Sequence, residues 1–250
     1  WRGNERGPWS LQGMRMGQGG CLVIDDRKNA FCSWSGGKES ALALFRARRS
    51  GFTITRLINM ITEDGTHSRT HGLEADLLSL QASSIGIPLT QRRTTWNGYE
   101  EEFKKVLSLL HAEGTLRGVF GDIDMEEHRA WVERVCSECD VSASLPLWLE
   151  EREDILSEFV NRGFKAVIVA VDRRCLDDRW IGREIDHAFA DDIRALGGDV
   201  DICGEKGEYH TFVYDGPIFQ RPVPFERGGI RSTDDYFFLD IKALPLKGLE

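Results

Sequence analysis

Six consecutive residues have the composition of a loop that binds an anion: Ser35, Gly36, Gly37, Lys38, Glu39 and Ser40. The two glycines let the backbone come close to a phosphate, while Lys38 adds a positive charge and the two serines add hydroxyl donors. An apolar run ends at Trp34 and a helix-forming run starts at Ala41. We therefore expect strand, loop and helix, the arrangement in which backbone N–H groups at a helix N-terminus bind phosphate. The alternative is a glycine turn before an ordinary helix, with Ser35 as its N-cap.

This loop does not match two common nucleotide-binding motifs. A Walker A loop needs a hydroxyl residue directly after its lysine and a glycine five positions before its second conserved glycine. Glu39 and Cys32 occupy those positions here. The dinucleotide-binding pattern G-x-G-x-x-G is also missing from this segment. Phosphate binding by this loop therefore implies a different class of nucleotide site.

A second dense group of polar residues follows much later in the chain: Gly204, Glu205, Gly207, Glu208, Tyr209 and Thr211. If Glu205 and Glu208 line a pocket, their carboxylates would bind a cationic group or an ammonium, or act as a base. The same spacing fits a solvated glycine turn between two strands equally well.

The apolar pattern of the first part predicts alternating strands and helices. Strands are expected at 30–34, 52–61, 87–91 and 118–122, and helices at 41–47, 73–84, 98–111 and 126–139. This spacing predicts parallel, right-handed β-α-β units. Ligands of such sheets bind at the carboxyl ends of the strands. We expect the loop at 35–40, the polar loop at 63–72 and Asp122, at the end of the fourth strand, to meet there.

The second part is less regular. Helices are predicted at 155–161 and 185–196 and a strand at 164–171, with strands and loops after residue 201. The fold class is therefore α/β, with a parallel-sheet nucleotide-binding domain at 29–143 and a smaller α/β domain at 144–250 that presents a substrate. Residues 1–28 are expected to be a poorly ordered extension, because the first 20 or so are rich in Gly, Arg and Gln.

Composition narrows the class of protein. The 250 residues carry a formal net charge of −9, with a pI near 5.3, which argues against general nucleic-acid affinity. The sequence shows no apolar run of eighteen residues and no signal sequence, so we expect no membrane span and a cytoplasmic location.

Six cysteines are spread along the chain. Cys136 and Cys139 form a C-x-x-C pair on a predicted helix, with no second pair or histidine cluster nearby. This context favours core packing over a zinc or redox site.

Taken together, the two polar segments resemble motifs of the diphthine–ammonia ligase family, ATP-binding proteins of the N-type ATP pyrophosphatase class. The loop is similar to the family's S-G-G-K-D-S, with Glu39 in place of Asp, and Gly204–Thr211 is similar to G-E-x-G-E-Y-x-T. Further similar motifs occur in the same order: Gln81-Ala82 with Gly86-Ile-Pro88, Gly121-Asp-Ile123 with His128-Arg129 and Glu133, Pro146-Leu-Trp148, and Ile181-Gly-Arg183. The resemblance covers about residues 30 to 219.

The resemblance implies a Rossmann-like, HUP-type ATP pyrophosphatase domain and an ATP-dependent amide-forming ligase. Such an enzyme adenylates a carboxylate, releases pyrophosphate and transfers ammonia. In the family's named reaction, diphthine on translation elongation factor two becomes diphthamide. ATP and Mg²⁺ are implied, free ammonia is the nitrogen source, and a homo-oligomer is compatible with the sequence. The chain shows no protein ligand set for a metal.

The resemblance also implies roles for individual residues. Lys38, Asp122, Glu205 and Glu208 would be catalytic. The nucleotide would be held by Ser35, Gly36, Gly37, Lys38, Glu39, Ser40, the backbone near Met60, and His71 as a phosphate or ribose contact. Asp122 would help the metal or the ribose. The acceptor would be bound by His128, Arg129, Glu133, Gly204, Glu205, Gly207, Glu208, Tyr209 and Thr211.

Several alternatives remain open at the level of sequence. Arg129 and Glu133 are also spaced as a pair that only supports a helix surface. Lys206 and His210 stand where the family's diphthamide branch often has Gly and Glu, which leaves the acceptor open. The competing functions are another amidation, thiolation of a tRNA base, and nucleotide sensing without turnover.

Overall fold

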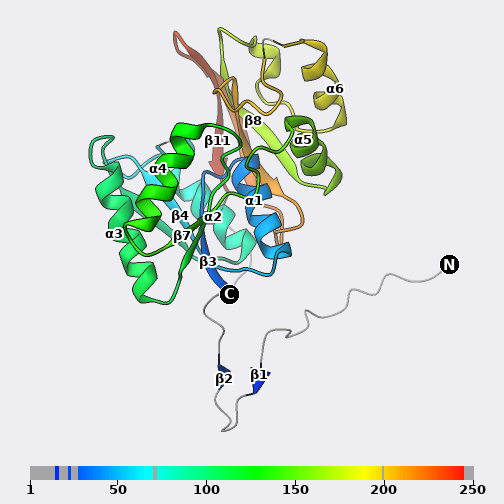
Figure 1. The fold of residues 1–250 in the computed structure, drawn as a ribbon. Helices are drawn as coiled ribbons and strands as arrows, with labels where there is room; N and C mark the ends of the chain where they lie inside the picture. The colour runs from blue at the N-terminus through cyan, green and yellow to red at the C-terminus, as the bar shows by residue number, and fades with distance from the viewer. Residues whose placement is uncertain (1–14, 17–21, 24–27, 70–71, 199, 245–250) are drawn as a thin grey trace, which may run out of the picture.

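Two β-sheets form the framework of the protein, one parallel and one antiparallel (Figure 1). The computed structural model describes residues 15–16, 22–23, 28–69, 72–198 and 200–244. The parallel sheet has five strands in the order β5-β4-β3-β6-β7, and the antiparallel sheet has four in the order β10-β11-β8-β9. The predicted fold class is confirmed: a Rossmann-like parallel sheet with helices is followed by a second unit that combines helices and strands.

The first unit alternates strands and helices in the predicted order. Its strands are β3 (Asn29–Ser33), β4 (Thr53–Ile61), β5 (Leu89–Arg93), β6 (Arg117–Val119) and β7 (Ser142–Ser144). Its helices are α1 (Lys38–Arg49), α2 (Ala75–Ile85), α3 (Tyr99–Ala112) and α4 (Glu126–Ser137). Strand β6 is shorter than predicted, because its pairing with β7 ends at Val119. Asp122 therefore lies in the loop after the strand.

The strand order reverses direction between β3 and β6. In a doubly wound sheet, the connections after two such neighbouring strands leave toward opposite faces and open a crevice between them. The loop at 35–40 follows β3, and Asp122 follows β6. The topology alone therefore brings these two segments to one crevice.

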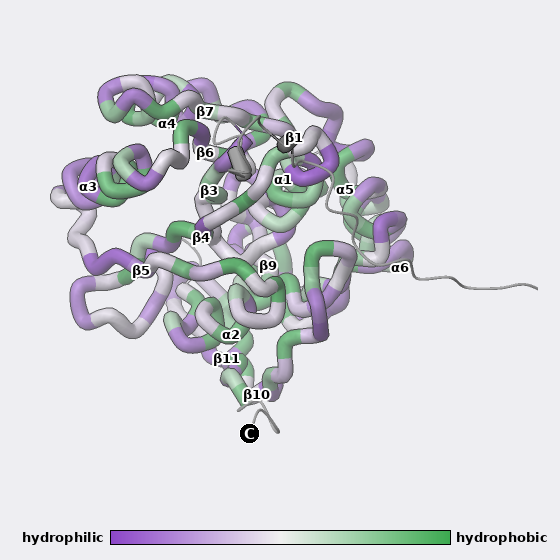
Figure 2. Tube along the Cα trace, turned by 90° about the horizontal axis from the view of Figure 1, so that it is seen from below, coloured by the Kyte–Doolittle hydropathy of each residue, from purple (hydrophilic) through white to green (hydrophobic). Residues whose placement is uncertain are grey.

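Helices cover both faces of the parallel sheet. On one face, α3 and α4 pack against β3 and β4, with Phe31, Ile58, Phe103 and Val135 in a shared buried cluster. On the other face, α1 and α2 bury an apolar cluster that continues into the second unit. Figure 2 shows hydrophobic segments in the middle of the molecule, near the labels β4 and β9, and hydrophilic residues mainly on the rim.

The second unit packs helices on the antiparallel sheet. It contains α5 (Arg152–Asn161), β8 (Lys165–Asp172), the short helix η2 (Asp178–Trp180), α6 (His187–Ala195), β9 (Tyr209–Asp215), β10 (Phe225–Ser232) and β11 (Tyr236–Ala243). Its core residues, such as Phe159 and Phe212, belong to the same cluster as Leu42 and Leu77 of α1 and α2. The two units therefore share one hydrophobic core.

The boundary predicted between residues 143 and 144 falls inside β7, the last strand of the parallel sheet. Most of the predicted extension at 1–28 lies outside the described residues. Within it, β1 (Arg15–Met16) pairs with β2 (Leu22–Val23) in antiparallel orientation. Among the described residues, none of the helices combines the length and the apolar composition that crossing a membrane requires.

Gln81 of α2 joins the loop at 35–40 to the second sheet. Its buried side chain donates from Nε2 to the carbonyl oxygens of Gly36 (3.0 Å) and Val213 (2.6 Å). Its Oε1 accepts a hydrogen bond from Trp34 Nε1 at 2.7 Å. Val213 N also donates to Gly36 O at 3.0 Å. One amide side chain thus holds the segment after β3, the loop glycine and strand β9 in fixed relation.

Replacement of Gln81 by leucine should lower the free energy of unfolding by about 2–4 kcal/mol, because Val213 O and Trp34 Nε1 would lose their partner inside the core. The half-buried Gln91, which donates to Ala75 O at 2.9 Å, is the matched control. Gln91→Leu should cost less than about 1 kcal/mol. Urea unfolding of both variants measures the difference, and equal losses would contradict the role given to Gln81.

Candidate active site

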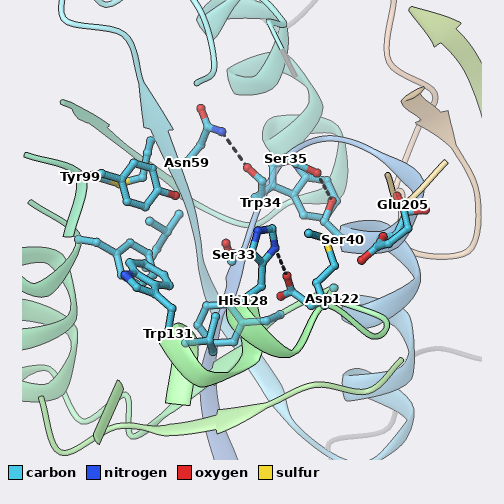
Figure 3. Close-up of a pocket in the computed structure, with 18 of the residues that line it drawn as sticks. Ser33, Trp34, Ser35, Ser40, Asn59, Tyr99, Asp122, His128, Trp131 and Glu205 are labelled. Carbon is cyan, nitrogen blue, oxygen red and sulfur yellow. Dashed lines mark hydrogen bonds and ion pairs between the residues drawn. The ribbon is translucent and has the colours of Figure 1, made fainter. Parts of the chain in front are cut away.

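A cavity of about 490 Å³ opens at the carboxyl ends of β3, β4 and β6, at the crevice that the strand order creates (Figure 3). Its polar lining comes from Ser33, Ser35, Glu39, Ser40, Asn59, Asp122, His128, Gly204, Glu205 and His210. Its aromatic lining comes from Trp34, Trp96, Tyr99, Phe103, Phe120 and Trp131, and Met60 lies among them. Both sheets therefore contribute to one cavity, with a charged side and an aromatic side.

The loop at 35–40 presents a helix N-terminus to this cavity. Helix α1 starts at Lys38; its N-cap residue is Gly37 and not Ser35, and the first N–H of the helix, Lys38 N, donates to Thr211 Oγ1 of β9. The hydroxyls of Ser35 and Ser40 lie 3.2 Å apart. Gly36 has φ of 84°, and a Cβ there would come within 2.5 Å of Leu78. Ser35 Oγ donates to Ser40 Oγ, and Ser40 Oγ donates to Gly37 O at 3.0 Å, so an anion at the positive end of the helix dipole would be bound by these hydroxyls only after they rotate.

Lys38 points away from the cavity, into the second unit. Its ammonium donates to Cys203 O, pairs with Glu39 Oε1 at 2.5 Å and lies 4.5 Å from the centroid of the Tyr209 ring. Burial works against the charged form, but the combined effects of Glu39, Tyr209 and Cys203 outweigh it, so the pKa of Lys38 lies above its ordinary value. In this arrangement Lys38 connects the loop at 35–40, called the phosphate loop from here on, to the segment around Cys203.

Glu205 lies beside Ser40, on the side of the cavity away from Tyr99 and Trp131 (Figure 3). Its Oε1 accepts a hydrogen bond from Ile123 N at 3.3 Å. Burial raises the pKa of Glu205 to about 7, and the nearby charges of Glu39 and Asp122 act in the same direction. Its carboxyl group therefore exchanges a proton near neutral pH, as a general acid or base requires.

Glu208 has a different place from Glu205. Its two carboxylate oxygens accept hydrogen bonds from Asp201 N and Lys206 N, each at 3.0 Å, and the residue is 3% exposed. It therefore closes the loop at 201–208 on itself and does not line the cavity. Gly207, with φ of 90°, allows the turn that separates the two glutamates.

Tyr209 and Thr211 of β9 lie behind the cavity wall. The Tyr209 hydroxyl donates to Ile202 O at 2.6 Å, and Thr211 Oγ1 accepts a hydrogen bond from Lys38 N at 3.1 Å. Gly204 does line the cavity, and a Cβ there would lie 2.8 Å from Tyr209 O. These residues place Glu205 and the phosphate loop, while acceptor contact by Tyr209 or Thr211 stays a prediction.

The predicted residues of α4 divide between two faces of the helix. His128 lines the cavity, and its Nδ1 lies 3.3 Å from Asp122 Oδ1. Hydrogen bonding to Asp122 raises the pKa of His128. Arg129 pairs instead with Glu133 at 2.7 Å and lies 5.0 Å from the Trp148 ring. Arg129 and Glu133 are not brought to the cavity, so their acceptor role also stays a prediction.

Two predicted nucleotide contacts remain. The side chain of Met60 lines the cavity, but its carbonyl oxygen accepts a hydrogen bond from Arg69 N at 3.0 Å. His71 lies outside the described residues.

Sequence reasoning missed the aromatic side of the cavity. Tyr99 begins α3 and Trp131 lies on α4, and their ring centroids are 5.8 Å apart. Trp131 Nε1 donates to Glu100 Oε2 at 2.9 Å, which fixes the indole. Burial raises the pKa of Tyr99 to about 12, so its hydroxyl stays protonated. One signal was available: Trp131 follows His128 by three positions, so both lie on one face of a helix.

His210 was noted in the sequence as a departure from the family pattern, without a site role. It lines the cavity from β9. Burial lowers the pKa of His210 to about 4, so the imidazole is neutral at physiological pH.

The Cys136 and Cys139 pair lies apart from the cavity. Both thiols are free, and burial raises the pKa of Cys136 to about 12. In the part of the chain that the structure describes, no three His, Cys, Asp or Glu side chains are grouped so that they could hold a metal. These two cysteines pack in the core and at its edge, as their sequence context favours.

A doubly wound parallel sheet with an open helix N-terminus and a cavity at its switch point defines a nucleotide-binding α/β protein. Residues 28–143 match the family model of the diphthamide synthase N-terminal domain, and residues 151–244 match that of the C-terminal domain. The chain therefore belongs to the diphthamide synthase family. Its membership makes it an ATP-dependent ligase.

Curated relatives agree with this family. A diphthine–ammonia ligase of Rattus norvegicus is 28% identical over 86% of this chain and 89% of its own length. The enzyme of that name from Homo sapiens is 28% identical over 76% of this chain and 79% of its own length. A solved structure described as a predicted subunit of tRNA methyltransferase from Methanocaldococcus jannaschii DSM matches with a TM-score of 0.41 and 14% identity, over 76% of this chain and 97% of that chain. No conclusion is drawn from a likeness this weak.

The pKa of Glu205 predicts a pH-dependent effect on stability. The folded protein raises this pKa from an ordinary 4.5 to about 7, so stability is lost as the pH rises from about 4.5 to about 7, where the unfolded chain releases this proton and the folded protein keeps it. Glu205→Gln should therefore stabilise the fold by on the order of 1–2 kcal/mol at about pH 8, allowing for solvent at this half-buried side chain, and by almost nothing at about pH 4.

Thermal unfolding at both pH values measures this difference. Glu208→Gln is the matched control, because an amide replaces one of two oxygens that accept backbone N–H groups. It should destabilise the protein at both pH values. A Glu205→Gln effect that is the same at both pH values would show that Glu205 titrates normally.

Proposed function

We propose that this protein uses ATP to adenylate a carboxylate and then joins ammonia to it, forming an amide. One observation carries the proposal: the N-terminus of α1, with the hydroxyls of Ser35 and Ser40 beside it, and a carboxylate of near-neutral pKa, Glu205, line the same cavity. The first group suits the triphosphate of ATP, and the second suits proton transfer to or from the acceptor side. The name of the relatives, diphthine–ammonia ligase, describes the same class of reaction.

The phosphate loop would hold the β- and γ-phosphates. Backbone N–H groups at the start of α1 and the hydroxyls of Ser35 and Ser40 would donate to phosphate oxygens. Mg²⁺ would arrive with the triphosphate, because it keeps several waters and needs only one or two protein carboxylates besides phosphates. Glu39 and Asp122 line the cavity and fit that requirement. In the arrangement seen here, Lys38 would fix the loop and its charge from behind.

The chemistry would run in two steps. The acceptor carboxylate attacks the α-phosphorus, pyrophosphate leaves, and an acyl-adenylate forms. Ammonia then attacks the acyl carbon, and AMP leaves with the electron pair of the broken C–O bond. Glu205, ionised above about pH 7, would take the proton that the attacking nitrogen loses.

We propose diphthine of elongation factor two as the acceptor, by analogy with the named relatives. Thiolation of a tRNA base is less well supported, because the buried thiol of Cys136, with its pKa raised to about 12, is poorly suited to sulfur transfer. Nucleotide sensing without turnover would use the same cavity, and an assay of products separates it from the ligase.

The proposed reaction predicts that ATP, Mg²⁺, ammonium and diphthine-bearing elongation factor two yield AMP and pyrophosphate in equal amounts, together with the amide. Loss of one hydroxyl that donates to a phosphate, in Ser40→Ala, should lower kcat/KM for ATP by about 10- to 100-fold. Ser108→Ala is the control, since that hydroxyl donates to Lys104 O on the exposed face of α3. Formation of ADP, or binding of ATP without any AMP, would reject the ligase.

We further propose that the aromatic side of the cavity holds the adenine ring. Tyr99 and Trp131 lie across the cavity from Ser35 and Ser40 (Figure 3). Aromatic faces bind bases by stacking, and the Tyr99 hydroxyl would add a donor for a ring nitrogen. The Met60 carbonyl already accepts from Arg69 N, so the rings carry more of this proposed contact than the strand backbone does.

This base site predicts distinct effects of two substitutions at one position. Tyr99→Leu should weaken ATP binding by about 5- to 100-fold, since stacking on one ring contributes about 1–3 kcal/mol. Tyr99→Phe should lose less, because it keeps the ring. Affinity for inorganic tripolyphosphate should not change in either variant. Calorimetry measures the affinity of each variant for ATP and for tripolyphosphate. Tyr236→Leu on β11 is a control outside the cavity. Equal loss of ATP and tripolyphosphate affinity would place the base elsewhere.

A further inference from the structure

Arg152, the first residue of α5, joins two loops that come from different units. Its Nη2 lies 2.8 Å from Asp124 Oδ2, and its Nε lies 2.5 Å from Asp201 Oδ2. Asp124 belongs to the loop between β6 and α4, and Asp201 belongs to the loop that leads into β9. One guanidinium therefore bridges segments that are far apart in the sequence.

These two loops carry groups on the side of the cavity where the proposed reaction needs the acceptor carboxylate, here called the acceptor side. The first loop holds Asp122 and Ile123, and the second holds Glu205. A direct hydrogen bond also links them, from Ile123 N to Glu205 Oε1, but its length of 3.3 Å makes it weak. Two charged contacts of 2.5 and 2.8 Å at Arg152 are the stronger constraint. The separation of the loops is therefore set mainly at Arg152.

Asp201 passes this constraint along its own loop. Its side chain is 4% exposed, and its Oδ1 accepts a hydrogen bond from Cys203 N at 2.8 Å. Its own N–H donates to Glu208, which also accepts from Lys206 N. The loop from Asp201 to Glu208 is thus closed by internal hydrogen bonds, so a force on Asp201 displaces the loop as one body.

We propose that Arg152 is a positioning residue, which fixes Glu205 beside the phosphate loop through Asp124 and Asp201. This inference rests on the ligase function proposed above. Within the described part of the chain, Arg152 is not among the residues that line the cavity. It acts on the reaction only through the two loops. Its effect should fall mainly on the chemical step, because the phosphate loop keeps its hydrogen bonds to Gln81 and Thr211 although Lys38 also joins it to Cys203.

The test compares Arg152→Gln with Arg194→Gln in the full-length protein. Arg194 also bridges two acidic residues, Glu153 at 2.7 Å and Asp191 at 3.0 Å, but it lies on α6 away from both loops. Arg152→Gln should lower kcat by about 10- to 100-fold, as expected when a reacting group is displaced by about 1 Å. KM for ATP should stay within about threefold. Arg194→Gln should change neither constant.

Amide hydrogen exchange supplies a readout that does not depend on turnover. Without Arg152, the Cys203 amide, which donates to Asp201, should exchange at least about tenfold faster, while amides of α1 keep their rates. Asp124→Asn, which cuts only one arm of the bridge, is the second variant if Arg152→Gln folds poorly. Its effect on kcat should not add to that of Arg152→Gln, because both act through one bridge.

Three results decide between the alternatives. A lower kcat with unchanged ATP affinity and faster exchange at Cys203 supports the positioning role. Lower thermal stability with unchanged kcat overturns it, since Arg152 would then only stabilise the fold. If the wild-type protein forms no AMP, the ligase proposal fails by itself. Exchange at Cys203 then still decides whether Arg152 holds the loop, and an unchanged rate rejects it.

Discussion

The hydrogen bonds that join Gly36 to β9 are the constraint on which the rest of the structure depends. Gly36 O accepts from both Val213 N and Gln81 Nε2, and a side chain at Gly36 would collide with Leu78. The loop after β3 is therefore shaped by the second unit as much as by its own strand. The cavity at the switch point of the parallel sheet is lined by residues from both units, whose sheets pack around α1 and α2.

This packing determines which charged side chains reach the cavity and which point away from it. Lys38 is drawn behind the loop toward Cys203, while Glu205 and Asp122 remain at the cavity surface. Burial raises the pKa of Glu205 more than the charge of Lys38 lowers it, whereas Glu208, a few residues away, accepts hydrogen bonds from two backbone N–H groups. The orientation of their loop thus gives the two glutamates different roles. In our proposal Glu205 takes part in the reaction, whereas Glu208 stabilises the loop.

Much of the fold followed from the sequence, because strand and helix periods in the first unit are regular and short loops join them. The phosphate loop and Glu205 could be proposed from residue types alone. The roles of Tyr209 and Thr211 could not, since alternation along β9 decides which side chains reach the cavity. Tyr99 and Trp131 were missed because their meeting depends on how α3 packs against α4. Local patterns report a strand or a helix, but not which distant element lies beside it.

The shared core has a consequence for how the protein is made. Helices α1 and α2 are covered by the parallel sheet on one side and by strands of the second unit on the other. Until the ribosome has synthesised β9, the apolar surface of both helices stays open to water. A nascent chain in this state is prone to aggregation. The nucleotide site therefore forms only after β9 has been made.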